Sequence, residues 1–357
     1  MSDEFPEIPG YEVIALIGRG GMADVYEGIQ KTLGRRVAIK IRRARHDRHD
    51  EVLRKRFLES ARLHGSIFHP CVVHVIDCVQ TSVCDTVILE YLEGDTVEAR
   101  LRQLKRLPVI ASLKAVIGIA DALSCLHAKG VVHRDIKPSN LMYVEEGLSS
   151  PLKLLDFGVA KGLGTEHDLT LKGSNIGTLW YMPPEQFGSG KVEPSWDVYA
   201  LAGTLYEMIS GRLPFHERTE TAVFRRHIDG KPIPEWPHEL MVQYGDLFHV
   251  LKICLETRRE TRLCDLAVFQ KLLSALVIQY EDPKSCSTQR SVAEDRLVDS
   301  LRPLPADVSE RLKRILLETP HDTTITMEAQ RVDGSGEYRS MDDTVITDTI
   351  VVGDEQD

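Results

Sequence analysis

The spacing of apolar and polar residues divides the chain into two parts of different character. Over residues 11–41, short apolar runs alternate with glycines, as in "YEVIALIGRGGMADVYEGI" and "RRVAIKI", a pattern typical of strands joined by tight turns. Residues 51–64 have apolar positions at helical spacing and are followed by Gly65, so they predict a helix. Residues 71–79 and 86–92 are further strand candidates. The first 90 residues are therefore expected to form a small sheet with one long helix.

After Gly94 the apolar pattern becomes helical, and it thins out toward the end of the chain. The segments that predict helices are residues 112–130, 197–211, 245–256 and 267–280. Two weaker amphipathic stretches follow, around 291–301 and 306–318, and from Pro320 onward we expect disorder. The expected organisation is an N-terminal extension (1–10), an N-lobe (11–93), a C-lobe (94–280), an amphipathic helical extension (281–319) and a disordered Thr-rich tail (320–357).

The composition is that of an ordinary globular protein. The chain has 357 residues, 42% of them hydrophobic and 27% charged, enough for two lobes with cores of their own. No uninterrupted run of 18 apolar residues predicts a transmembrane segment, and the acidic start "MSDEFPEIPG" lacks the apolar region of a signal peptide. The seven cysteines include no C-x-x-C pair. This usage favours a reducing cytoplasm.

The negative charge is concentrated in the tail. The net charge is −10, which argues against a nucleic-acid-binding protein. Residues 320–357 hold ten acidic residues against Arg331 and Arg339, so −8 of this charge lies there. The chain is therefore expected to be a nearly neutral globular part followed by an acidic tail.

A glycine-rich segment precedes a strand that ends in lysine. In "IGRGGMADV" (17–25), glycines allow the backbone to approach a phosphate and leave its amide groups free to bind it. The strand "VAIK" that follows ends at Lys40, whose ammonium could pair with phosphate oxygens. Taken singly, a hairpin turn explains the glycine-rich segment equally well, and a surface lysine at a strand end is the better explanation of Lys40.

A second group of polar residues lies in "HRDIKPSN" (133–140) and "LLDFG" (154–158). Asn140 and Asp156 are oxygen ligands of the kind that Mg²⁺ takes together with phosphate oxygens and water. Asp135 could accept a hydrogen bond from a hydroxyl, and Lys137 could neutralise a phosphoryl group. Read alone, the first of these segments is a polar surface turn.

The order G-x-G, VAIK, HRD-x-K-P-x-N, DFG is that of protein kinases. Over roughly residues 11–275 the chain resembles a Hanks-type (eukaryote-like) bacterial serine/threonine protein kinase. The resemblance implies the bilobal, α+β protein-kinase fold. It also implies phosphoryl transfer from ATP with Mg²⁺ to serine and threonine hydroxyls of proteins, with autophosphorylation.

The resemblance also assigns residues to roles. Lys40 would hold the α- and β-phosphates, Asp135 would orient the acceptor hydroxyl and take its proton, and Lys137 and Thr178 would complete the catalytic group. Asn140 and Asp156 would bind the metal ion. The residues implied in ATP binding are Ile17, Gly18, Arg19, Gly20, Gly21, Met22, Ala23, Asp24, Val25, Ala38, Lys40, Glu90, Leu92 and Leu141.

Further contacts follow from the same resemblance. "GTLWYMPPEQ" (177–186) resembles the loop that receives the protein substrate, and its Glu185 would pair with Arg262. "DVYALAG" resembles the helix that braces the catalytic loop through Asp197. In "ILEY", Leu89 would be the gatekeeper beside the adenine.

Two positions depart from the kinase pattern. The third glycine of G-x-G-x-x-G is Ala23, a small residue that bacterial relatives often carry. More seriously, the helix glutamate expected to pair with Lys40 falls on Ser60, counting back from His69. Glu59 is one residue away, which is about 100° around a helix. Either the helix is turned or distorted to present Glu59, or Lys40 lacks its usual partner.

Three functions are compatible with these residues to different degrees. An active serine/threonine kinase is the leading hypothesis, and a pseudokinase that signals by conformation is the alternative that Ser60 favours. A small-molecule kinase is disfavoured by the protein-substrate loop.

Two sets of hydroxyl residues are predicted phosphorylation sites. Thr165, Thr170 and Ser174 lie between the DFG motif and Gly177. In the tail, "DTTIT" (322–326) recurs as "DTVIT" (343–347). Chance repetition in a Thr-rich segment explains this recurrence equally well. Phosphorylated threonines there would suit a phosphothreonine-binding partner such as a forkhead-associated domain.

Overall fold

The computed structural model describes most of the chain before residue 282 and one later helix. The described residues are 5–20, 23–43, 50–81, 84–156, 179–187, 191–215, 217, 219–281 and 306–318. The chain divides into a unit over Met1–Thr319 and a second one over Pro320–Asp357. The predicted tail is the second unit and lies outside the described residues.

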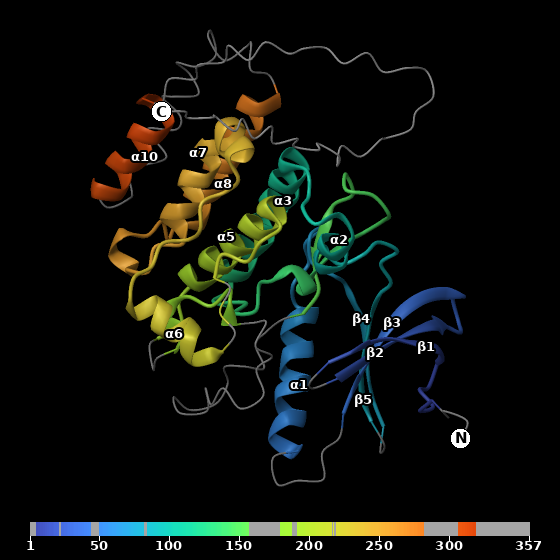
Figure 1. Ribbon diagram of the computed structural model, residues 1–357. Helices are drawn as coiled ribbons and strands as arrows, with labels where there is room; N and C mark the ends of the chain where they lie inside the picture. Colours follow the sequence, from blue (N-terminus) through green and yellow to red (C-terminus); the bar gives the residue numbers. More distant parts are fainter. Residues whose placement is uncertain are drawn as a thin grey trace, which may run out of the picture. The chain divides into compact units, whose positions relative to one another are not determined.

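The N-terminal part is a five-stranded antiparallel sheet with one helix, α1, beside it (Figure 1). The strand order is β1-β2-β3-β5-β4, and the register sets Lys40 opposite Val25 on one side and Val87 on the other. The strands are β1 (Tyr11–Arg19), β2 (Ala23–Gln30), β3 (Arg35–Arg42), β4 (Val75–Gln80) and β5 (Asp85–Glu90). Lys40 is therefore held by the middle strand of the sheet.

Helix α1 (Asp50–Gly65) begins with acidic residues and ends with basic ones, in agreement with the helix dipole. It buries Phe57, Ala61 and His64. Phe57 and Ala61 pack in one apolar cluster with residues of β5, including Leu89. Burial of a side chain as large as Phe57 stabilises the fold by about 1.5–3 kcal/mol. The helix is therefore held against the sheet mainly by this face.

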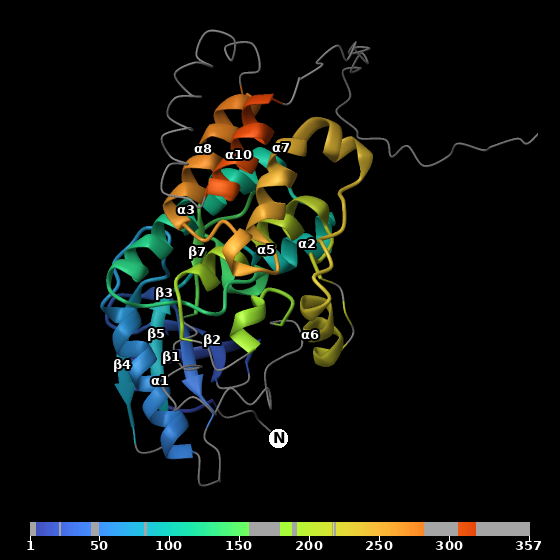
Figure 2. The same ribbon diagram turned by 90° about the vertical axis from the view of Figure 1, so that its left-hand side faces the viewer.

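The C-terminal part is mainly helical (Figure 2). Helix α5 is buried almost throughout and lies in a core with α3, α7 and α8. The helices are α2 (Val97–Leu104), α3 (Val109–Ala128), α5 (Ser195–Ser210), α6 (Glu220–Ile228), α7 (His238–Cys254), α8 (Leu266–Glu281) and α10 (Ala306–Glu318). A short two-stranded sheet, β6 (Leu141–Tyr143) with β7 (Leu152–Leu154), lies next to α3.

Helix α3 is the one helix of the described residues that is long and apolar enough to cross a membrane. Its residues Leu113, Val116, Ile119 and Leu123 are fully buried among the other C-lobe helices. The apolar length of α3 is thus accounted for by packing inside the lobe.

The predicted fold class is confirmed: an α+β fold with a β-rich N-lobe and a helical C-lobe. Two helices were missed, α2 and α6, both short and each capped by a threonine whose side chain accepts a backbone N–H. Helix α7 begins seven residues before the predicted Gly245, because it continues across a kink at Tyr244. The predicted helix near 306–318 is α10, which lies against α7 (Figures 1 and 2); the stretch 291–301 lies outside the described residues.

Candidate active site

The loop between α3 and β6 is held in shape by one buried carboxylate. Asp197, at the start of α5, accepts hydrogen bonds from the backbone N–H groups of His133 and Arg134, both at 2.8 Å. It also lies 2.8 Å from Nε2 of His127. Arg134 has a φ of 65°, a left-handed conformation that is unfavourable for a residue with a Cβ. Because Asp197 accepts the N–H of Arg134, it stabilises this strained loop, as the resemblance implied.

The polar residues of this loop gather around Asp135. Lys137 Nζ donates to Asp135 Oδ1 at 3.1 Å, and Asn140 Nδ2 donates to Asp135 Oδ2 at 3.0 Å and to its backbone oxygen at 2.7 Å. A 3₁₀ turn, Pro138–Asn140, brings the amide back over the aspartate. The Asp135 carboxylate is thus oriented by a cation and an amide, while its side chain keeps a small exposed surface.

Lys40 reaches this group from the N-lobe. Its Nζ lies 2.6 Å from Asp156 Oδ1, an ion pair between β3 and the residue that follows β7 by two positions. Burial opposes ionisation of Asp156, but the Lys40 ammonium and its hydrogen bond outweigh it and hold the pKa of this carboxyl below its ordinary value. Asp156 is therefore ionised at neutral pH and lies where the two lobes meet.

Helix α1 supplies no carboxylate to Lys40 within the described residues. It is a regular helix over Asp50–Gly65, and Glu59 lies 4.0 Å from Lys55 on the outer side. The first alternative from the sequence, a helix turned to present Glu59, is therefore wrong for this structure. The second alternative, that Lys40 lacks its usual partner, is the one that the structure shows, and Asp156 pairs with Lys40 instead.

The glycine-rich segment crosses over between β1 and β2. Gly20 N donates to Ala23 O at 2.9 Å, and a Cβ on Gly20 would meet that oxygen at 2.8 Å, so a larger residue would distort the turn. The side chain of Asp24 is bound by Arg43 at 2.6 Å. Gly21 and Met22 lie outside the described residues, as does Thr178.

Of the residues predicted beside the adenine, some lie in one apolar cluster and others do not. Ala38 is paired in register with Leu89, and both belong to an apolar cluster with Leu92 and Met142. Ile17 is about half exposed on the edge strand. Leu141 is fully buried in the C-lobe core, so Met142, not Leu141, lies with the other residues predicted beside the adenine. The side chain of Glu90 forms an ion pair with Lys153 and accepts the N–H of His74, so this segment between the lobes is anchored on both sides.

The oxygen donors present suit Mg²⁺. Asn140 uses its amide nitrogen toward Asp135, which leaves its carbonyl oxygen as a neutral ligand, and Asp156 supplies an ionised carboxylate. Such a pair is typical of a hard cation that is completed by phosphate oxygens and water. Among the described residues no group of three His, Cys, Asp or Glu side chains could hold a metal ion, so a site made of protein ligands alone is absent there.

The predicted pair of Glu185 with Arg262 is present. Nη1 and Nη2 of Arg262 donate to the two carboxylate oxygens at 2.7 and 3.2 Å. Nη2 also donates to the backbone oxygen of Thr257, and Nε donates to that of Glu256. The guanidinium is fully buried and lies over the Tyr199 ring. This bidentate pair fixes the end of the segment 179–187 to the C-lobe core.

Sequence reasoning missed two histidines near the site. His127 binds the bracing Asp197, and His64 on α1 is buried with Nε2 2.7 Å from Val73 O. The signal for His64 was its place on the apolar stripe of the helix, seven residues after Phe57. For His127 no pattern in the helix pointed toward Asp197, 70 residues later.

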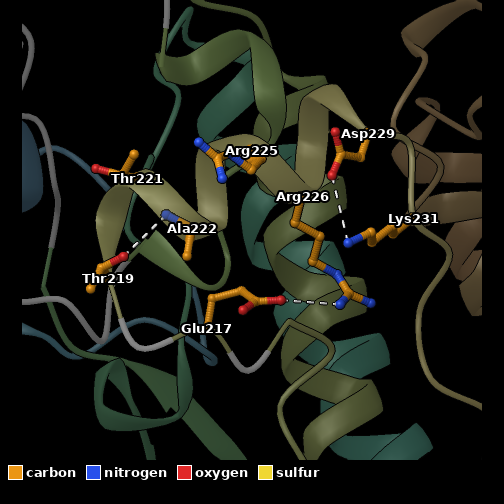
Figure 3. A pocket seen from close by; sticks show the side chains of 8 residues that line it. All are labelled: Glu217, Thr219, Thr221, Ala222, Arg225, Arg226, Asp229 and Lys231. Atoms are coloured by element: carbon orange, nitrogen blue, oxygen red, sulfur yellow. Dashed lines mark hydrogen bonds and ion pairs between the residues drawn. The ribbon is translucent and has the colours of Figure 1, made fainter.

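A separate cavity of about 250 Å³ lies beside α6 (Figure 3). Of the three cations that line it, Arg226 and Lys231 are paired with Glu217 and Asp229, which line it too, and Arg225 is the third. Trp180 donates to Glu217 O at 3.0 Å, so the cavity adjoins the segment that follows Thr178. Because its charges nearly balance, we assign it no part in phosphoryl transfer.

Comparison with known proteins gives one consistent result. The sequence pattern of the protein kinase domain family matches residues 11–274 of this chain. A probable serine/threonine-protein kinase of Clostridium perfringens is 34% identical over 63% of this chain and 32% of its own length. Serine/threonine-protein kinase Pkn1 of Myxococcus xanthus is 32% identical over 76% of this chain and 38% of its own. A serine/threonine-protein kinase of Corynebacterium efficiens is 31% identical over 92% of this chain and 62% of its own. The chain thus spans about a third of the length of the first two of these relatives.

Proposed function

Because the chain belongs to the protein kinase domain family, we propose that it transfers the γ-phosphoryl group of ATP to serine and threonine hydroxyls of proteins, its own included. The observation that carries the proposal is the meeting of Asp135, Lys137 and Asn140 in one turn with the Lys40–Asp156 pair across from it. These are the acid, cation and metal-ligand positions that phosphoryl transfer needs in one place.

In the proposed reaction the oxygen of a substrate hydroxyl attacks the γ-phosphorus, and the bond to the β-phosphate oxygen breaks to release ADP. Asp135 orients the hydroxyl and receives its proton. Lys137, 3.1 Å from Asp135, lies where it neutralises the transferred group. Lys40 moves from the carboxylate of Asp156 to the α- and β-phosphates. Mg²⁺ held by Asn140 and Asp156 would supply charge neutralisation across the phosphates.

Two features support serine and threonine as acceptors. Lys137 is the form usual in serine/threonine rather than tyrosine kinases, and the relatives described above carry the serine/threonine name. The pseudokinase alternative rested on Ser60 alone. Lys40 has an anionic partner in Asp156, which removes the reason for treating it as a stranded cation.

The direct test uses purified chain, ATP labelled at the γ position, Mg²⁺ and a general protein substrate. We expect label on serine and threonine of the substrate, and loss by a factor on the order of 10²–10³ or more in Asp135→Asn. The matched control is Asp121→Asn, on the outer face of α3. Undiminished transfer in Asp135→Asn would overturn the proposal.

We further propose that phosphorylation of Thr165, Thr170 or Ser174 activates the enzyme, with Thr170 first. In support, burial lowers the pKa of Arg134, and its Nε is buried without a hydrogen-bond partner in the part of the chain that the structure describes. A phosphate would compensate this cation. Mass spectrometry of autophosphorylated protein should find at least one of the three modified; finding none argues against this step.

For the acidic tail we propose autophosphorylation at one or more of Thr323, Thr326, Thr344 and Thr347. A tethered segment reaches an effective concentration in the millimolar range, and each phosphate adds about −1.5 to −2 charge. A phosphothreonine-binding domain of the forkhead-associated type is the proposed partner, in the cytoplasm. Deleting residues 320–357 should abolish its binding and leave phosphorylation of external substrates intact.

A further inference from the structure

The N-terminal end of α1 is bound to the sheet by a compact group of charges. Arg42, near the end of β3, donates to Asp50 at 2.6 Å and to Asp85 at 3.1 Å. Arg54 donates to both oxygens of Asp85, at 2.8 and 3.1 Å. We call these four residues the α1 charge cluster. Asp85 and Arg42 are buried, with side-chain exposures of 3% and 8%, so the cluster is far less screened than a surface ion pair.

The cluster lies on the same face of α1 as the buried residues. Asp50, Arg54, Phe57, Ala61 and His64 follow one another at spacings of four and three, the spacing of a single helix face. With about 100° per residue, this stripe lies about 180° from Glu59. Presenting Glu59 to Lys40 would carry Asp50 and Arg54 away from Arg42 and Asp85. The cluster and an inward Glu59 therefore exclude one another.

The C-terminal end of this stripe of buried residues lies near the Lys40–Asp156 ion pair. His64 binds Val73 O at 2.7 Å, and the charges of Asp156 and Lys40 both act on its ring. Phe57 and Ala61 pack against residues of β5 beside Lys40, such as Val87. A change in the rotation of α1 would therefore move these side chains and alter the geometry of the Lys40–Asp156 pair.

We propose that Asp85 is a positioning residue for phosphoryl transfer: by binding Arg42 and Arg54 it sets the rotation of α1, in place of a carboxylate from α1 itself. This rests on the proposed kinase activity. The function of a helix-borne carboxylate, to hold the helix toward the active site, is carried out here at the far end of the same helix. The catalytic lysine is left to pair with Asp156.

The test compares Asp85→Asn with Glu51→Gln in the full chain. Glu51 is a suitable control because it is an acidic residue of the first turn of α1 that is exposed and comes no closer to Arg54 than 3.9 Å. We expect kcat to fall about tenfold or more in Asp85→Asn, with the KM for the protein substrate within about twofold, because residues that share one charge network are energetically coupled. Glu51→Gln should match the parent.

A second substitution separates positioning from stability. Ser60→Glu places a carboxylate at the α1 position where the sequence pattern expects the partner of Lys40, so adding it to Asp85→Asn should recover at least half of the lost kcat. A loss that Ser60→Glu does not recover, or a folded Asp85→Asn with parental kcat, overturns the proposal. If Asp85→Asn does not fold, Arg54→Gln is used, because Asp85 then keeps Arg42; the same rescue is expected.

Amide hydrogen exchange of α1 gives a readout that does not depend on activity. Residues 57–64 should exchange at least several-fold faster in Asp85→Asn than in Glu51→Gln, while α3 and α5 stay unchanged. Unaltered exchange in α1 contradicts the proposal. If the parent transfers no phosphate but its α1 exchange responds as expected, the proposed activity fails while the role of the cluster in α1 stands.

Discussion

The two lobes complete their halves of the active site in different ways. In the C-lobe, Asp135, Lys137 and Asn140 lie within one short loop, and a single carboxylate, Asp197, holds that loop by two backbone N–H groups. In the N-lobe, Lys40 has no partner from α1 among the described residues and binds Asp156 of the other lobe. One half is self-contained, whereas the other depends on how a helix is set against a sheet.

The difference shows which contacts withstand a change of sequence. In the proposed reaction each polar residue of the C-lobe loop touches the reacting groups or holds a residue that does, so each one is needed. A helix is positioned by the sum of its contacts, so the loss of one carboxylate is compensated by an apolar stripe and the α1 charge cluster. We therefore expect catalysis to be intolerant in the C-lobe loop and tolerant at Glu59.

The largest effect is expected where the two halves share a residue. Asp156→Ala removes both the proposed metal ligand and the partner of Lys40, and phosphoryl transfer should fall by on the order of 10³ or more. Rates are measured with labelled ATP on protein whose fold is checked by circular dichroism. Glu281→Ala, which removes an exposed acid paired with Lys114, serves as the control. A rate of transfer within tenfold of the parent would contradict the proposed role of Asp156 in phosphoryl transfer.

A smaller effect separates a buried C-lobe ion pair from an exposed N-lobe one. Glu185→Gln leaves the buried guanidinium of Arg262 without its carboxylate, and the free energy of unfolding should fall by about 3 kcal/mol. Glu93→Gln, which removes an exposed partner of Arg36, should cost less than about 1 kcal/mol. Urea unfolding of both variants measures the two values. Equal losses would contradict the contrast in burial.

Acid should weaken both lobes through buried histidines. Burial lowers the pKa of His64 in the N-lobe and of His227 in the C-lobe to about 4 in each case. Since the unfolded chain takes up these protons first, the stability is fully present above pH about 6.5 and is lost as pH falls toward 4.

Urea unfolding at pH 7.5 and pH 5 checks this prediction. His64→Gln and His227→Gln should each reduce the difference between the two pH values by on the order of 1–2 kcal/mol. His249→Gln is a weaker control, because that ring is less buried than the other two. A pH difference that stays the same in both variants would assign the acid sensitivity to other groups.

How much of this the sequence predicts depends on how local each contact is. The gathering of Asp135, Lys137 and Asn140 could be predicted from the sequence, because the residues of this loop lie within eight positions and share the backbone of one turn. The pairs Glu185–Arg262 and Asp197 with the loop followed from the family resemblance and are present.

The partner of Lys40 could not be predicted in this way. Glu59 and Ser60 differ by one position, and which of them faces inward depends on Asp50, Arg54 and Phe57 meeting a sheet whose strands come from distant segments. The spacing of apolar residues in the sequence indicated the buried face of α1. Nothing in the sequence indicated that Asp85 would pair with Arg54 at its end. Helix α6 was missed for a different reason: it is only nine residues long, and its apolar residues Phe224 and Ile228 are exposed, so it offers few core positions.

The central claim is that Lys40 works in catalysis without a carboxylate from α1. The most direct measurement is a side-by-side determination of kcat and KM for ATP in Lys40→Met, Glu59→Gln and the parent. We predict that Lys40→Met loses a factor on the order of 10² or more, while Glu59→Gln stays within about twofold of the parent. If Glu59→Gln loses as much as Lys40→Met, the helix does supply the partner, and the contrast between the two lobes is wrong.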